Sequence, residues 1–384
     1  MTDISGKMRI CEVIESAAGG SCRHMIDLCT GLAGRGHDVH VIYSPLRADP
    51  RYVAELNALP VTLQTVDMYR SIGMHDLRSA RNLASAIRSA GPFDIVHGHS
   101  SKAGALIRLI PVGDARRVYT PHAFRGLDPS AKLATRCVFD GAEMILGYLR
   151  TDALVTVSNE ELDFARRRHI APGRRHVILN GVVDPVGTGR EEAREALGVP
   201  ADAVVIGFIG RLTAQKSPER FLEAMIRLLP MAPSAHAVMM DDGENAAALD
   251  DLLESPALRE RFIRLRGKRA SEYLPGFDML MMTSRYEGLP YVMLESLAAG
   301  VPLVTTDVAG ARDVIADSRC GIITSNGAGA VDELAAATLE LIANPGQRAE
   351  MAAQALYRSG QLNGPRMVLE TEALYRSLCD RPAR

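Results

Sequence analysis

Short apolar runs alternate with longer amphipathic segments along the chain, a pattern typical of strands that alternate with helices. In the first half, the expected strands are residues 9–14, 38–43, 94–99, 116–120 and 152–158. In the second half, they are residues 203–210, 236–240, 262–266, 277–282 and 302–306. Helical stretches such as 21–36 and 101–110 lie between them. The alternation predicts an α/β protein whose parallel sheets are covered by helices on both faces.

A stretch rich in Gly and Pro, NGVVDPVGTGREE (180–192), interrupts the alternation and marks the expected linker. We predict a first doubly wound, Rossmann-like domain over residues 1–184 and a second over residues 185–364. Residues 365–384 begin as an amphipathic helix. Two such domains would face each other across a cleft, with ligands beyond the carboxyl ends of the strands.

The composition narrows the class of protein. With 47% hydrophobic residues and a net charge of −2, the chain can form folded cores and lacks the basic excess that nucleic-acid binding requires. None of the six cysteines lies in a CxxC motif or in a cluster with histidines at zinc spacing. We therefore expect free thiols and no metal site.

The sequence also bears on location. The first residues run almost directly into a strand without an apolar leader, and no run of about 18 apolar residues occurs, so we expect a cytoplasmic protein. Segment 165–176 is basic, and segment 131–150 mixes apolar residues with Lys132, Arg136 and Arg150. Both suit a peripheral contact with the inner membrane surface, although a solvated helix face and domain packing explain them as well.

A dehydrogenase is disfavoured. The segment GLAGRG (31–36) closes a helix instead of following a strand, and no GxGxxG follows strand 9–14.

Two cations follow the first strand of the second domain. In VVIGFIGRLTAQKSPERFLEAM (204–225), Ser217 is a suitable N-cap and Pro218 a suitable first helical residue, which places Arg211 and Lys216 in the loop before the helix. Such a pair suits a diphosphate, although basic loops without a ligand are equally common. The spacing is not that of a P-loop, so phosphoryl transfer is not indicated.

Two glutamates flank the start of a later helix, in SRYEGLPYVMLESLAAGVP (284–302). Glu287 lies just before the expected first helical residue, Pro290, and Glu295 lies roughly 7–8 Å further along the helix axis. A helix N-terminus suits a phosphate, and a carboxylate on either side suits two polyols, which together fit a nucleotide sugar. An ordinary ion pair would explain Glu295 equally well.

These segments together resemble the signatures of family-four retaining glycosyltransferases of the GT-B fold. The similarity lies in GRLTAQKSPERFLEA, SRYEGLPYVMLESLAAGVPLVTTDVAG, AAGGSCRHMIDLCTGLAGRGHDV, DIVHGHSSKAGALIRL, YTPHAF and NGV, in the family's order. The resemblance implies two facing Rossmann-like domains, the first on the acceptor side and the second binding the nucleotide sugar. It also implies that the helix of residues 365–384 crosses back onto the first domain.

The resemblance further implies roles for individual residues. Catalytic roles would fall to Glu287, His122, Arg211 and Lys216. Donor-binding roles would fall to Gly19, Gly20, Arg211, Lys216, Glu287, Gly288, Leu289, Pro290 and Glu295. The cations would hold the diphosphate, Glu295 the ribose, and Glu287 the sugar, with His122 facing that sugar across the cleft.

The chain also departs from the family pattern. ARDVI (311–315) replaces a proline and an acidic residue, and MMDDGEN (239–245) replaces a GDG turn near the expected base pocket, so uridine is only slightly favoured over guanosine. The pair DD is not a metal-binding DxD motif, and the resemblance implies metal-independent transfer without a cofactor.

The acceptor side is expected at HGHSSKAGALIRL (97–109). Ser100 or Ser101 would cap a helix there, beside His97, His99 and Lys102, and this cluster suits an acceptor phosphate, such as that of a polyprenyl-diphosphate-linked sugar. Helix capping alone explains the serines equally well.

The expected activity is retaining transfer of a hexose from a nucleotide sugar to a glycan or lipid-linked acceptor in surface polysaccharide assembly. A GT-B nucleotide-sugar epimerase and a non-catalytic sugar-binding protein are the alternatives. A retaining glycosidase fits less well, because it needs two carboxyl groups roughly 5–5.5 Å apart across an open sugar site.

Overall fold

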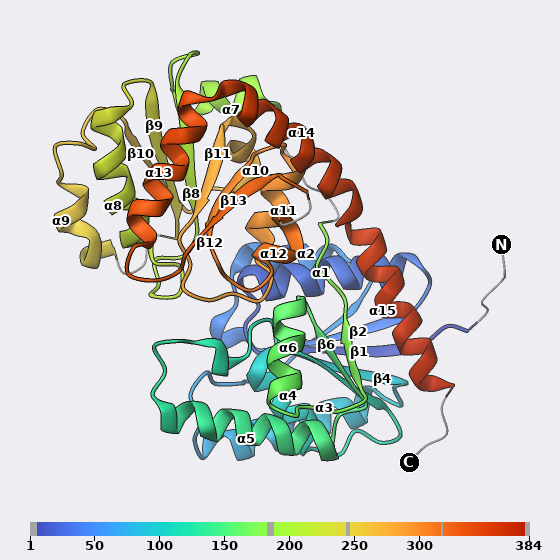
Figure 1. The fold of residues 1–384 in the computed structure, drawn as a ribbon. Coiled ribbons are helices and arrows are strands. Elements are labelled where there is room, and N and C mark those ends of the chain that lie inside the picture. The colour runs from blue at the N-terminus through green and yellow to red at the C-terminus, as the bar shows by residue number, and fades with distance from the viewer. Residues whose placement is uncertain (1–5, 183–187, 243–245, 316–317, 381–384) are drawn as a thin grey trace. The chain divides into compact units, whose positions relative to one another are not determined.

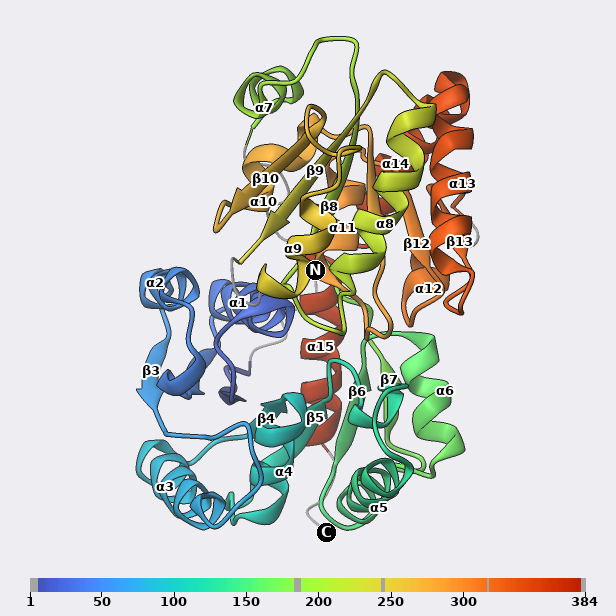
Figure 2. The same ribbon diagram turned by 90° about the vertical axis from the view of Figure 1, so that its left-hand side faces the viewer.

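The computed structural model describes residues 6–182, 188–242, 246–315 and 318–380. The chain forms two compact units, one of Met1–Val183 with Asn363–Arg384 and one of Asp184–Leu362 (Figures 1 and 2). Each unit is built on its own parallel sheet, and each is described separately below.

The sheet of the first unit has seven strands in the order β3-β2-β1-β4-β5-β6-β7, all parallel. The strands are β1 (Arg9–Ile14), β2 (Asp38–Tyr43), β3 (Thr62–Thr65), β4 (Ile95–His99), β5 (Arg116–Thr120), β6 (Ala153–Thr156) and β7 (Arg175–Val177). The five expected strands are all present. The sequence pattern missed β3 and β7, because these short edge strands are partly accessible to solvent and lack a continuous apolar run.

Helices cover both faces of this sheet (Figure 2). They are α1 (Gly19–Gly34), α2 (Pro50–Ala58), α3 (His75–Ala90), α4 (Ser100–Leu109), α5 (Leu133–Leu149), α6 (Asn159–Arg167) and α15 (Gly364–Cys379). Along β1, Ile10 and Ile14 point into the core formed with α1 and α15, whereas Cys11 and Val13 point into the core formed with α3 and α4. Because side chains alternate along a strand, Glu12 points toward α1 and α15.

The C-terminal helix α15 packs against α1, as expected. The contact is close because Gly31 has no side chain: a Cβ there would lie 2.4 Å from Val368 Cγ2. Glu372 of α15 bonds to Arg35, His37 and Arg376 at the same contact.

The sheet of the second unit has six parallel strands in the order β10-β9-β8-β11-β12-β13. They are β8 (Val204–Ile209), β9 (Ala235–Asp241), β10 (Phe262–Arg266), β11 (Met279–Met282), β12 (Leu303–Thr306) and β13 (Gly321–Thr324). The edge strand β13 was not expected. The helices are α7 (Arg190–Leu197), α8 (Pro218–Leu228), α9 (Asp250–Leu253), α10 (Ala270–Tyr273), α11 (Tyr291–Ala298), α12 (Ala311–Ile315), α13 (Ala330–Ala343) and α14 (Pro345–Gln361). In both units the prediction of parallel α/β sheets is confirmed.

Two helix starts differ in detail from the sequence expectation. Helix α8 begins at Pro218, but Ser217 has a φ of 48° and does not cap with its side chain, because its hydroxyl bonds to Ala214 O and to the Glu219 carboxylate. Helix α11 begins at Tyr291, and Pro290 is its N-cap residue.

Candidate active site

Two loops of the second unit are tied together at the carboxyl ends of β8 and β11, which are neighbours in the sheet. The Thr283 hydroxyl donates to the carbonyl oxygens of Lys216 and Ser217, each at 2.9 Å. Arg285 N donates to Gln215 O at 2.8 Å. The loop 210–217 and the loop 283–290 therefore form one rigid surface at this edge.

Glu287 and Lys216 meet where these loops join. Lys216 Nζ lies 2.6 Å from Glu287 Oε1, which also accepts from Ser284 Oγ at 2.8 Å. Gln215 Nε2 lies 3.4 Å from Glu287 Oε2. Glu287 is only 6% exposed, so three polar partners surround a nearly buried carboxylate. An ammonium has three N–H donors, so Lys216 keeps donors for a further anion.

Arg211 is exposed in the same loop, and it has no side-chain partner among the described residues. The nearby Thr213 Oγ1 is buried and also lacks a hydrogen-bond partner in the described structure. The loop thus carries one free cation and one free hydroxyl beside the Lys216–Glu287 pair, as an anion-binding loop would.

The turn before α11 is shaped by the loop that follows β12. Gly310 has a φ of 83°, and a Cβ there would lie 2.9 Å from Gly288 O and 2.7 Å from Leu289 Cδ1. Gly288, Leu289 and Pro290 are buried in that turn, and Glu295 is half-buried on α11. Their predicted donor contacts stay predictions.

The two departures from the family pattern have local structural roles. Asp241 of the DD pair is buried and bonds to Arg264, with 2.6 Å between Arg264 Nε and Asp241 Oδ2. Asp242 Oδ1 accepts from Leu212 N at 3.5 Å, and residues 243–245 of that turn lie outside the described residues. In α12, which carries ARDVI, Arg312 pairs with Asp307.

In the first unit, Gly19 and Gly20 are the first residues of α1, the helix that follows β1 in the chain. Gly19 has a φ of 69° with open space around its Cβ position, so the backbone conformation, not crowding, requires glycine there. Gly20 is exposed, and the first N–H groups of a helix have no partner within the helix.

His122 lies in a strained loop after β5. His122 has a φ of 53° and Ala123 a φ of 97°, conformations that non-glycine residues rarely adopt. Buried Glu161 holds this loop by accepting from Ala123 N at 2.6 Å and from Val157 N at 3.0 Å. Burial raises the pKa of Glu161 to about 7, against the opposing effect of its backbone donors. Burial also lowers the pKa of His122 well below its ordinary value.

His97 and His99 face the interior instead of an acceptor. His97 bonds to Tyr375 OH at 2.6 Å and to Thr120 Oγ1 at 2.8 Å. His99 bonds to Glu12 Oε2 at 2.7 Å and to His122 Nε2 at 3.0 Å. The sequence pattern did not single out Glu12, although a carboxylate inside the apolar strand RICEVI was a usable signal.

Ser100 and Lys102 have different surroundings. The N-cap of α4 is His99, not Ser100 or Ser101, and Ser100 Oγ is buried without a partner among the described residues. Lys102 Nζ bonds to both oxygens of Asp76 at 2.9 Å and to Ser71 O at 2.8 Å. The four predicted acceptor residues therefore do not form one exposed cationic site.

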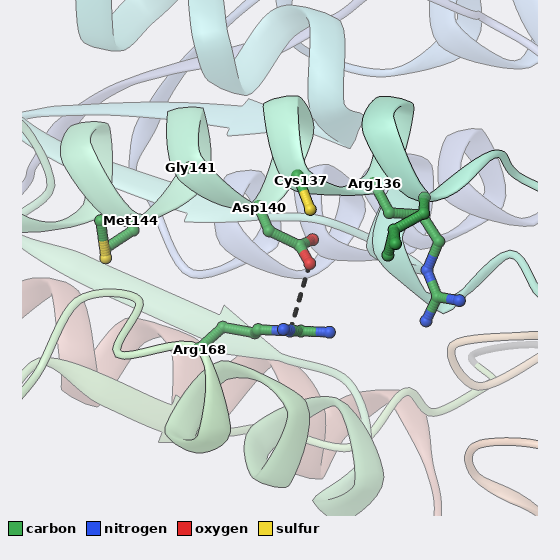
Figure 3. A pocket seen from close by; sticks show the side chains of 7 residues that line it. Arg136, Cys137, Asp140, Gly141, Met144 and Arg168 are labelled. Carbon is green, nitrogen blue, oxygen red and sulfur yellow. Dashed lines mark ion pairs between the residues drawn. The ribbon is translucent and has the colours of Figure 1, made fainter.

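Helix α5 lines a hollow in the first unit (Figure 3). Asp140 Oδ2 lies 3.1 Å from Arg168 Nε across it, with Arg136 further along the helix. Among the described residues, no helix is both long and apolar enough to cross a bilayer.

Known proteins match both halves of the chain. A family model described as Glycosyltransferase Family 4 matches residues 18–184, and one described as Glycosyl transferases group 1 matches residues 189–357. The D-inositol 3-phosphate glycosyltransferase of Corynebacterium urealyticum is 27% identical over 317 residues, which are 76% of this chain and 73% of that protein. An Escherichia coli UDP-Gal:alpha-D-GlcNAc-diphosphoundecaprenol alpha-1,3-galactosyltransferase is 25% identical over 259 residues, which are 65% of this chain and 66% of that protein.

Solved structures share the fold. Anabaena HepE, solved in complex with UDP-glucose, superposes with a TM-score of 0.81 at 20% identity, covering 96% of this chain and 100% of that one. WaaG, a glycosyltransferase involved in lipopolysaccharide biosynthesis, superposes with a TM-score of 0.74 at 18% identity, covering 97% and 98%. The chain therefore belongs to glycosyltransferase family 4 and has the GT-B fold, as its motifs implied.

Proposed function

We propose that this protein is a retaining hexosyltransferase. It takes its sugar from a nucleoside-diphosphate donor, a UDP-sugar in preference to a GDP-sugar, and passes it to a glycan or polyprenyl-diphosphate-linked acceptor in surface polysaccharide assembly. The observation that carries the proposal is the meeting of Lys216 and Glu287 at 2.6 Å in the loop of Arg211, whose side chain has no partner among the described residues. The HepE complex with UDP-glucose and the Escherichia coli galactosyltransferase with its diphosphoundecaprenol-linked acceptor support this choice of donor and acceptor.

The proposed chemistry follows from where charge develops. As the bond between the sugar and the diphosphate breaks, the diphosphate gains negative charge and the sugar becomes oxocarbenium-like. Arg211, Lys216 and the N-terminal end of α11 stabilise that diphosphate, because fixed cations and N–H donors act most strongly where charge appears in the transition state. A leaving phosphate oxygen takes the proton of the acceptor hydroxyl, which attacks from the same face.

Glu287 positions the sugar and does not form a covalent bond to it. In the structure its carboxylate already accepts from Lys216 and Ser284, so it is held as a hydrogen-bond acceptor for sugar hydroxyl groups. Donor binding then places the diphosphate against the remaining N–H groups of Lys216. Arg211, with its planar fork, serves the same phosphates.

A donor assay tests the proposal. The protein is incubated with radiolabelled UDP-glucose, UDP-galactose or the GDP-sugars, first alone and then with an undecaprenyl-diphosphate-linked sugar. Transfer to the lipid with retained anomeric configuration supports the proposal. Isomerised donor would instead establish the epimerase, and donor left unchanged in every mixture would establish a binding protein. A thermal-shift panel of the same nucleotides identifies the base, since a ligand of the native state raises the melting temperature.

We also propose that α5 contacts the membrane surface peripherally. Its exposed apolar side chains fall on one face of the helix at 100° per residue, and these are Leu133, Val138, Met144, Ile145, Tyr148 and Leu149. Lys132, Arg136 and Arg150 lie on the same segment, and such a mixture favours an anionic lipid surface.

Vesicle co-sedimentation tests this contact. Ile145→Glu with Leu149→Glu should abolish binding to vesicles that contain anionic lipid. Leu356→Glu with Tyr357→Glu, which changes two exposed apolar residues of α14 in the second unit, is the matched control. Equal binding by both pairs contradicts the assignment of α5.

A further inference from the structure

Three imidazoles from separate segments converge inside the first unit. His24 comes from α1, His99 from the end of β4, and His122 from the loop after β5. One ring nitrogen of each lies within 4.8 Å of the others, and His99 Nδ1 and His122 Nε2 are 3.0 Å apart. A metal ion held at 2.0–2.1 Å by three tetrahedral ligands needs its nitrogens roughly 3.3 Å apart. Small side-chain movements are enough to reach that geometry.

Hydrogen bonds on the outer side of two rings direct their lone pairs inward. Glu12 Oε2 lies 2.7 Å from His99 Nε2, and a carboxylate oxygen only accepts, so His99 carries its proton on Nε2 and a lone pair on Nδ1. Asn180 Oδ1 lies 2.9 Å from His24 Nδ1, which leaves the lone pair of His24 on Nε2. Metal-binding histidines are oriented in this way by a carboxylate or carbonyl oxygen behind the ring.

Glu12 supplies a second, independent reason. Its carboxylate is fully buried, and its ion-pair partners within the described residues are His97 and His99, with no Lys or Arg. A buried carboxylate without a cation is costly. A divalent ion on the far side of His99 compensates that charge through the ring, as in carboxylate–histidine–zinc arrangements.

A second cluster, formed by Glu12, His97 and His99, fits a metal less well. Both nitrogens of His97 are taken, one by Tyr375 OH and the other by Thr120 Oγ1. All three of its members are buried, whereas His122 of the first cluster is half-buried and so in partial contact with solvent.

We propose that His24, His99 and His122 bind a divalent transition metal, Zn²⁺ foremost because imidazole nitrogens suit it, with Glu12 and Asn180 orienting two of the rings. The site lies outside the loops of the second unit, and it makes His122 a metal ligand in place of the sugar contact that the family resemblance implies, so it does not rest on the proposed transferase activity. Its ligands are spread over three segments, so no local spacing in the sequence marks it. The metal fixes His122 in its strained loop.

Metal analysis of the full-length protein, made without a polyhistidine tag, tests the proposal. Bound metal is removed with a chelator, and the protein is reloaded with Zn²⁺ and dialysed. The metal that it retains is then quantified by mass spectrometry. We expect one Zn²⁺ per chain in the wild type and in His236→Gln, a control on β9 whose ring bonds to Ser234 O. His24→Gln and His122→Gln should lose the ion, and Glu12→Gln should weaken binding about tenfold or more.

The wild type alone provides a test that survives any folding failure of a variant. Co²⁺ should give the intense visible bands of a tetrahedral site, and X-ray absorption of the Zn²⁺ form should show three imidazole ligands. Zn²⁺ at about a hundred times its dissociation constant should raise the melting temperature by roughly 5–10 °C. A wild type that holds no Zn²⁺ after reloading, or variants that bind it as tightly as the wild type, would show a hydrogen-bonded histidine cluster instead.

Discussion

Replacing Lys216 with methionine separates two effects of its ammonium group, one on stability and one on catalysis. The ammonium lies 2.6 Å from the Glu287 carboxylate, which is 6% exposed. Breaking a fully buried ion pair costs about 3–5 kcal/mol. Ser284 and Gln215 continue to donate to the carboxylate and the Lys216 side chain is 17% exposed, so we expect a loss of about 1–3 kcal/mol in the free energy of unfolding.

The effect of Lys216→Met on catalysis should be larger than its effect on stability, and the two can be measured separately. Losing one fixed cation from the diphosphate site removes about 2–4 kcal/mol of transition-state stabilisation, which lowers kcat/KM about 30- to 900-fold. In Lys216→Met with Glu287→Gln, the unpaired charge disappears, so stability should partly return while activity does not. Arg211→Met is the matched control: this exposed residue should lower activity similarly and change stability by less than about 0.5 kcal/mol.

The assays are urea denaturation for stability and initial rates with labelled donor for kcat/KM. If Lys216→Met kept the wild-type kcat/KM, the lysine would have no role toward the diphosphate. If the double variant regained activity, Lys216 would serve only to neutralise Glu287. Either result refutes the assignment of the loop.

Three further predictions concern the first unit. Burial raises the pKa of Glu161 from 4.5 to about 7, so its protonated form is favoured on folding, and the stability it contributes below pH 4.5 is lost as pH rises to about 7. This lowers the free energy of unfolding by about 3 kcal/mol between pH 4.5 and pH 7. In Glu161→Gln, the melting temperature should depend less on pH over this range. If the melting temperatures of the two proteins changed in parallel with pH, the assignment of this effect to Glu161 would be contradicted. Burial tends to raise the pKa of Glu372, but its bonds to Arg376, His37 and Arg35 outweigh this effect and hold the pKa at about 2. Its contribution to the free energy of unfolding is therefore present above pH 4.5 and is lost as the pH falls toward 2. Glu372→Gln should lower stability at pH 7 by about 1–3 kcal/mol and remove that acid-dependent part, whereas an unchanged acid transition speaks against it. Gly31→Ala should destabilise the protein by about 1–3 kcal/mol, because its added Cβ meets Val368. Gly34→Ala should not destabilise it, because the space at its Cβ position is open. Equal effects of the two substitutions on the melting temperature would rule out the tight contact at Gly31.

The sequence predicted every strand in the interior of the two sheets and missed three of the four edge strands. All ten expected strands are present, and nine of them lie inside the sheets while β10 lies at an edge; the missed strands β3, β7 and β13 are short edge strands with mixed exposure. Turn chemistry correctly placed Ser217 at the N-cap position and Pro218 at the start of α8, but the Ser217 hydroxyl bonds to Glu219 instead of capping the helix. Local patterns cannot report such tertiary competition for a polar group.

The candidate site was predictable in outline only. The spacing of Glu287 and Glu295 indicated a helix entrance, but the pairing of Glu287 with Lys216 depends on β8 and β11 being neighbours in the sheet. The contacts of His99 also depend on which strands are neighbours. His99 was expected to face an acceptor, yet Glu12 of the adjacent strand β1 binds it inside the core. Strand order decides these contacts, and single-sequence patterns do not contain it.

The position of α15 has a consequence for the order in which the chain matures. Tyr375, near the end of the chain, bonds to Glu12 near its beginning, and Met367, Val368 and Leu378 complete the core against α1. Domains usually fold as they leave the ribosome, N-terminal first. Here the N-terminal sheet cannot close its core until translation has passed residue 378, by which time the intervening unit, Asp184–Leu362, has been entirely synthesised. A chain that is released after Leu362 should therefore present a folded second unit joined to an unfinished first one that still needs chaperone protection.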